Sequence, residues 1–211
     1  MSATRLLVLG VVRMHGSAHG YQVRRELLSW SADKWANVQP GSIYHALKKM
    51  TTEQLLEQVA TEAGSGPDRT AYRLTEDGEA EFQLLLARAL SQPDPASQER
   101  SAAIVLMTAL PRERVLGLLR HQLVQLEAEH RTAGMLADER TAGEKPAHVH
   151  ELFRLWQLHA DANVTWLREL VARLEAGEYL MADDSGQSFG EPPARRPTTA
   201  RGRGASRHCA D

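Results

Sequence analysis

The segment from residue 37 to residue 56, NVQPGSIYHALKKMTTEQLL, constrains the fold of this chain more than any other. Pro40 and Gly41 interrupt the preceding structure, and the hydroxyl of Ser42 is then expected to cap a helix by accepting a hydrogen bond from a free backbone N–H. Within that helix the apolar residues recur at three- and four-residue spacing, so they form one buried stripe. They are Ile43, Ala46, Leu47 and Met50. The segment therefore predicts an amphipathic helix that ends near Glu53.

The opposite face of this helix has a hydroxyl, a phenol, an imidazole and two ammonium groups. They belong to Ser42, Tyr44, His45, Lys48 and Lys49, and the next carboxylate in the sequence is that of Glu53. Such a face suits a polyanion with readable hydrogen-bonding edges, which the major groove of DNA offers. Many exposed helix faces hold two lysines, so the flanking sequence has to decide whether this one binds DNA.

Two further helices are expected upstream of this segment. Residues 4–14 have a helical apolar pattern, with Gly16 as the stop, and residues 19–30 form a second helix that contains Arg24 and Arg25. Residues 31–39 are expected to connect it to the next helix, with Trp30 and Trp35 covering the edge of the core.

The downstream sequence predicts a hairpin and then another helix. Residues 55–60 and 71–75 have the composition of short strands, and the turn between them is rich in glycine and proline. Arg69 and Arg73 stand on its return side. Thr75 is expected to cap a helix that runs to about Leu90, with acidic residues in its first turn. Three helices followed by a two-stranded hairpin have the order of a winged helix-turn-helix.

The C-terminal half predicts two long amphipathic helices. One starts at Pro111 and ends near Arg140, and the other covers residues 147–176. Together they form an antiparallel hairpin that has no second layer to cover its apolar surface, so self-association is expected. The residues expected at the dimer interface are Val149, Leu152, Phe153, Trp156, Leu167 and Leu170.

The predicted organisation is mainly α-helical, with two cores. Residues 1–90 form the winged helix-turn-helix, 91–98 a proline-containing linker, 99–180 the helical dimerisation domain, and 181–211 a disordered tail rich in Arg, Pro and Gly. The arginines of the tail would suit DNA contact or simple solubilisation equally well.

Composition excludes several classes of protein. The 211 residues have a net charge of −2, and the first ninety contain ten charges of each sign, so DNA binding would need a local positive patch. The short apolar run at the N-terminus is followed by Arg13 and His15 without a cleavage site, and no run is long enough to span a membrane. A cytoplasmic protein is expected. Cys209 is the single cysteine, which excludes an internal disulfide.

The N-terminal segments together resemble the PadR family of bacterial transcriptional regulators. The resemblance rests on LLVLGVVRMHGSAHGYQVRREL, VQPGSIYHALKKM and RTAYRLTEDGEAEF, which follow one another over most of the first ninety residues. It implies a homodimeric winged-helix repressor that binds an inverted-repeat operator and is released by a small molecule. The recognition helix would be 42–50, with Tyr44, His45, Lys48 and Lys49 at groove-facing positions and the wing contributing Arg69 and Arg73. Family members usually have a glycine in the turn after this helix, where this chain has Gln54.

Other interpretations remain open at the level of sequence. An enzyme or a metal site is disfavoured, because His148 and His150 would point to different faces of a helix, no pair of catalytic carboxylates stands out, and no cofactor is indicated. A winged-helix adaptor that does not bind DNA would fit the near-neutral charge. Tyr44 would also fit a packing role. An apolar or phenolic effector could be held by Phe153, Trp156, Trp166 or Met135, although such residues are more often core or dimer contacts.

Overall fold

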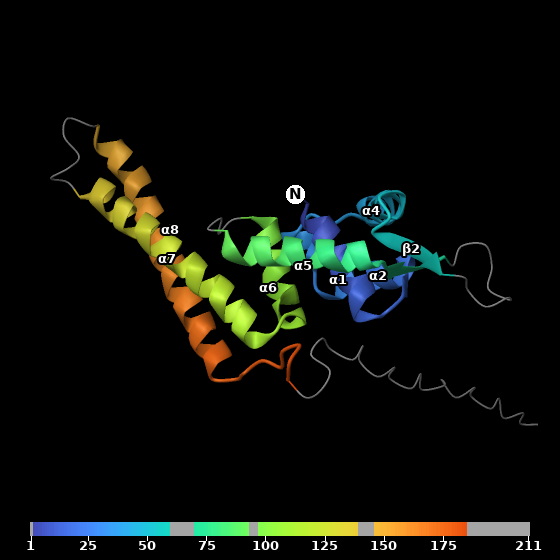
Figure 1. Ribbon diagram of the computed structural model, residues 1–211. Coiled ribbons are helices and arrows are strands. Elements are labelled where there is room, and N and C mark those ends of the chain that lie inside the picture. The colour runs from blue at the N-terminus through green and yellow to red at the C-terminus, as the bar shows by residue number, and fades with distance from the viewer. Residues whose placement is uncertain (1, 60–69, 93–96, 139–145, 185–211) are drawn as a thin grey trace, which may run out of the picture.

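The computed structural model describes residues 2–59, 70–92, 97–138 and 146–184. Helix α4 (Pro40–Thr52) and strand β2 (Leu56–Val59) lie at one end of the molecule, and the long helices α7 (Arg112–Ala137) and α8 (Ala147–Glu175) project from the other (Figure 1). Helices α1, α5 and α6 fill the space between them. The chain is therefore mainly helical, as the sequence predicts, with a winged helix-turn-helix and a helical hairpin.

Four helices form the N-terminal part. They are α1 (Ala3–Met14), α2 (Gly20–Ser29), α3 (Ala32–Trp35) and α4 (Pro40–Thr52). Helix α1 is buried along its middle on every side, from Leu6 to Val12, because α2, α4, α5 and α6 all pack around it. Gly16 adopts the left-handed conformation that ends this helix, at φ +67°. The short helix α3 occupies the segment predicted as a connector, and the indole N–H of Trp35 donates to the carbonyl of Trp30 at 2.9 Å.

The predicted two-stranded wing is part of a three-stranded antiparallel sheet. Strands β2 (Leu56–Val59) and β3 (Ala71–Leu74) pair as expected, and a two-residue strand, β1 (Ala18–His19), pairs with the other edge of β3. Strand β1 was not predicted from the sequence, because two residues have no detectable periodicity. The consequence is that the start of α2 is tied to the wing.

Helix α5 (Glu76–Ser91) starts where the sequence predicts, since the hydroxyl of Thr75 accepts a hydrogen bond from the N–H of Gly78 at 3.0 Å. The next helix, α6 (Gln98–Leu106), was not recognised as a separate element, and a short 3₁₀ turn, Met107–Ala109, follows it. Helix α6 packs against both α1 and α5, and a Cβ on Gly10 would lie 2.6 Å from Leu106. The first helix after the predicted linker thus belongs to the same core as the winged helix.

Helices α7 (Arg112–Ala137) and α8 (Ala147–Glu175) form the predicted antiparallel hairpin. In the half of the hairpin nearest the winged helix, α7 and α8 close over buried leucines such as Leu119, Leu167 and Leu170. Leu167 and Leu170 were predicted at a dimer interface, and this is wrong because their side chains are 0% and 3% exposed inside the chain's own hairpin. One continuous cluster of buried residues runs from α1 to α8, so the expectation of two separate cores is also wrong.

The first residues of the predicted tail are held against α7. The guanidinium of Arg112 donates to the carbonyls of Leu174 and Tyr179 at 2.7 and 2.8 Å and binds the carboxylate of Asp184 at 2.6 Å. Met181 is fully buried. Residues 181–184 are therefore part of the fold, which corrects the predicted boundary of the tail, and the rest of that segment lies outside the described residues.

None of the helices in the described ranges is both long enough and apolar enough to cross a membrane.

Candidate nucleic-acid interface

Helix α4 begins two residues earlier than its sequence suggests. Pro40 is its first residue and Gln39 precedes it, so Ser42 does not cap the helix as predicted. Instead the hydroxyl oxygen of Ser42 accepts from the N–H of Gln39 at 3.1 Å and donates to the carbonyl of Gln39 at 2.7 Å. Proline at the first position requires no N–H partner there, which explains the earlier start. Ser42 thus fixes the start of α4 from inside the helix.

The outer face of α4 is exposed to solvent. Tyr44, His45, Lys48 and Lys49 all lie on it, while Ile43, Leu47 and Met50 are buried on the other side. The ammonium of Lys49 is 3.9 Å from Glu53, and its side chain is 61% exposed. That carboxylate is bound more closely by Arg5, at 2.5 Å, so Glu53 neutralises Lys49 weakly. Two lysines are thus available to a polyanion on one helix face.

Tyr44 combines packing with exposure. Its ring lies directly over Gly20 at the start of α2, where an added Cβ would be 2.6 Å from the ring, and yet half of the residue faces solvent. Both interpretations of Tyr44 from sequence are therefore compatible with its position, because the ring packs on α2 while part of it remains accessible. The contact joins two sequence motifs, HGY at residues 19–21 and SIY at residues 42–44.

The first turn of α1 lies beside the same face, which was not predicted from the sequence. A groove of about 210 Å³ runs between it and α4, lined by Ser2, Thr4, Arg5, His45 and Lys49 among others. Arg5 is engaged by Glu53 and Glu81, at 2.5 and 3.1 Å. The hydroxyls of Ser2 and Thr4 consequently extend the polar surface beyond α4.

Of the wing, the described residues include the paired strands β2 and β3 at its base. Arg73 points across the sheet to Glu57 on the neighbouring strand, with a nitrogen–oxygen distance of 2.6 Å, and remains 58% exposed. Its pairing reduces the positive charge that it presents. Arg69 lies outside the described residues.

Comparison with known proteins assigns these features to a family. Residues 8–84 match the model of the transcriptional regulator PadR-like family. Residues 8–84 thus form a PadR-like domain. The negative transcriptional regulator PadR of Bacillus subtilis is 24% identical over 182 residues, which cover 83% of this chain and 99% of that protein.

Solved structures of the Bacillus subtilis PadR are also similar. The one in complex with operator DNA is 22% identical, covers 81% of this chain and 98% of its own, and has a TM-score of 0.37. The one in complex with p-coumaric acid is 21% identical, covers 82% and 99%, and has a TM-score of 0.36.

The turn after α4 lies inside this PadR-like domain and has Gln54 at the position where the resemblance led us to expect glycine. Gln54 adopts φ +60°, the left-handed conformation that favours glycine. Its carbonyl accepts a hydrogen bond from the hydroxyl of Thr75 at 2.7 Å, and the carbonyl of Leu55 accepts one from the N–H of Thr75 at 3.1 Å. The turn therefore keeps the glycine-type geometry with a glutamine, and contacts from the start of α5 hold it.

The hairpin residues predicted for dimerisation and effector binding differ in their exposure and in their contacts. Val149 and Phe153 are partly buried, whereas Leu152 and Trp156 are 44% and 47% exposed. Phe153 meets Trp156 edge-on, with ring centroids 5.7 Å apart. Trp166 instead lies under the guanidinium of Arg100, and Met135 is 65% exposed.

Within the described ranges, no group of three or more His, Cys, Asp or Glu side chains is placed to hold a metal ion.

Proposed function

We propose that this PadR-like chain is a sequence-specific DNA-binding regulator, and that it acts as a homodimeric repressor on an inverted-repeat operator. The supporting observation is the exposed face of α4, on which Tyr44, His45, Lys48 and Lys49 stand together beside the wing. A helix of this kind fits the major groove, and the wing at residues 61–73 would contact the adjacent backbone.

The side chains on α4 differ in the contacts that suit them. Lys48 and Lys49 are point charges on long flexible stems, so they are assigned to phosphates. Tyr44 and His45 hold hydrogen-bonding groups close to the helix and are assigned to base edges. Ser42 contributes mainly by setting the start of α4, since its hydroxyl is already bonded to Gln39. Arg69 and Arg73 complete the proposed interface from the wing.

The hairpin of α7 and α8 is proposed to dimerise the chain through Val149, Leu152, Phe153 and Trp156. Dimerisation would place two recognition helices about 34 Å apart, in successive major grooves. We assign DNA binding to the winged helix at 1–90 and dimerisation to the helical part at 99–180, which share one continuous core. By analogy with the Bacillus subtilis PadR bound to p-coumaric acid, a small hydrophobic or phenolic effector would release the operator. The protein is proposed to act in the cytoplasm without catalysing a reaction.

The deciding experiment is an anisotropy titration of the duplex upstream of this protein's own gene, beside a scrambled duplex, at several salt concentrations. Tight, salt-dependent binding that prefers the native duplex supports the proposal. Equally weak binding to both duplexes would favour a winged-helix adaptor, which the equal numbers of positive and negative charges in the first ninety residues also allow.

A further inference from the structure

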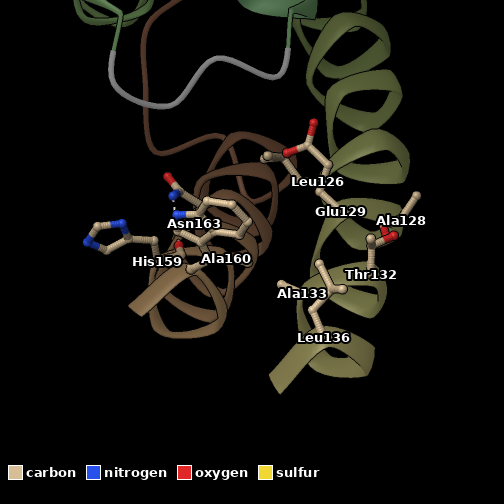
Figure 2. A pocket seen from close by; sticks show the side chains of 10 residues that line it. Leu126, Ala128, Glu129, Thr132, Ala133, Leu136, His159, Ala160 and Asn163 are labelled. Atoms are coloured by element: carbon tan, nitrogen blue, oxygen red, sulfur yellow. Dashed lines mark hydrogen bonds between the residues drawn. The ribbon is translucent and has the colours of Figure 1, made fainter. Parts of the chain in front are cut away.

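A cavity of about 460 Å³ lies between α7 and α8 in the half of the hairpin away from the winged helix. Figure 2 shows Leu126, Ala133 and Leu136 of α7 facing Ala160 of α8 across it. Trp156 also lines it. The volume is within the range of small-molecule sites, which are about 300–1,000 Å³.

The cavity follows from the size of the side chains along the hairpin. In the half nearest the winged helix, leucines such as Leu119 and Leu167 fill the space between the two helices and are almost fully buried. Farther out, Ala133 and Ala160 are small residues in the lining, and the space between them stays open although larger side chains such as Leu136 and Trp156 border it. The space is therefore built into the sequence of α7 and α8.

The polar groups of the cavity select against anions. Among the described residues, its lining includes the carboxylate of Glu129, the hydroxyl of Thr132, the imidazole of His159 and the amide of Asn163, but no lysine or arginine. The buried cation Arg100, which is 5% exposed, donates to the amide oxygen of the lining residue Asn163 at 3.2 Å. Its guanidinium also lies 5.0 Å from the centre of the Trp166 ring. A carboxylate in the cavity would thus meet Glu129 without a lining cation, whereas an uncharged hydroxyl can donate a hydrogen bond to it.

We propose that the α7–α8 cavity binds an uncharged aromatic molecule that has a hydroxyl group, and that Glu129 makes it discriminate against aromatic carboxylates. The aromatic ring packs against Trp156 and the apolar wall, and the hydroxyl donates to Glu129. Only the regulatory use of this site rests on the proposed function. The binding itself does not require DNA.

The test titrates full-length protein, without DNA, with p-coumaric acid and with its methyl ester by calorimetry at pH 7.5. The two probes share the phenol ring and differ in charge. We expect the ester to bind at least about tenfold more tightly, which corresponds to about 1.4 kcal/mol. Glu129→Gln should reduce this ratio at least about threefold, mainly by strengthening binding of the acid. No binding of the ester, equal affinities, or a ratio that Glu129→Gln leaves unchanged would overturn the proposal.

A second pair of variants tests the location. Ala160→Phe fills the cavity and should weaken binding of the ester at least about tenfold. Ala162→Phe adds the same bulk to an exposed position of α8 that does not line the cavity, and it should bind the ester normally. Thermal unfolding checks that both variants fold.

The molar mass in solution distinguishes a ligand from a second copy of this chain as the occupant. The proposal expects the mass of Ala160→Phe to equal that of the wild type. A fall to the monomer mass would assign the cavity to a partner hairpin and overturn the proposal. Binding of the operator by ligand-free protein tests the proposed function separately, so the failure of one is not confused with the failure of the other.

Discussion

At the scale of single residues, Lys49 gives a direct test of the recognition face. Its side chain is 61% exposed and only weakly paired with Glu53, so we assign it to a phosphate. Lys49→Ala should weaken binding to operator and scrambled duplexes alike and lower the slope of log affinity against log salt by about one unit. Arg120→Ala removes the same charge from the hairpin, where Arg120 pairs with Glu175, and should change neither quantity. Unchanged affinity and slope for Lys49→Ala would place Lys49 off the DNA.

Gln54 gives a second test at this scale, this time of stability. A non-glycine residue at φ +60° is strained, and Gln54 is exposed, so removing its side chain loses little packing. After allowing for the larger entropy of glycine in the unfolded chain, Gln54→Gly should stabilise the protein by about 0.5–1 kcal/mol. Gln58→Gly makes the same change in the extended strand β2 and should destabilise by a similar amount. Urea unfolding at one fixed protein concentration measures both, and a destabilised Gln54→Gly would show that the strain argument is wrong.

At the scale of elements, Gly78 joins α5 to the end of the recognition helix. A Cβ at this position would lie 2.0 Å from the carbonyl oxygen of Leu55, which is backbone and cannot rotate away. Gly78→Ala should therefore destabilise the fold by about 2 kcal/mol or more. Gly117→Ala, in α7 with open space around it, should instead stabilise by up to about 1 kcal/mol. Urea unfolding compares the two, and a neutral Gly78→Ala would mean that α5 can move away from the turn.

The elements also show where sequence reasoning succeeds and where it fails. Helices α1, α2, α5, α7 and α8 were predicted within a few residues, because each combines a long apolar period with a recognisable cap or breaker. Strand β1 and helix α3 were missed because they are too short to show a period. Helix α6 was missed because its buried residues include Ala102 and Ala103, whose small side chains give a weak apolar signal. The exposed face of α4 was predictable, since three- and four-residue spacing alone separates it from the buried stripe.

At the scale of the whole molecule, the errors arise from contacts between distant segments. The sequence suggested a boundary at 91–98, yet α6 packs on α1 and α5, and the amide of Gln122 in α7 donates to the carbonyl of Gln92. Leu167 and Leu170 have the same apolar character as Leu152, and only the folded hairpin shows which of them remain exposed. Helical spacing identifies an apolar residue, but whether it meets its own chain or a partner depends on how far α7 and α8 separate along their length.

That separation leads to a prediction about assembly. Leu152 is 44% exposed on α8, beside Trp156, and we assign this surface to the dimer. In Leu152→Glu an unpaired carboxylate would be buried on association, which should raise the dimer dissociation constant at least about tenfold. Because two half-sites about 34 Å apart need both recognition helices, the preference for operator over scrambled DNA should fall with it.

Val124→Glu makes the same change at a position of α7 that is 65% exposed and does not line the cavity between α7 and α8. Light scattering at low micromolar concentration should give a dimer for the Val124 variant and a lower mass for the Leu152 variant. If the Leu152 variant remains a dimer with full operator preference, the partner subunit docks elsewhere. If the mass falls while the preference for operator persists, a single winged helix suffices for recognition and the dimer serves another purpose.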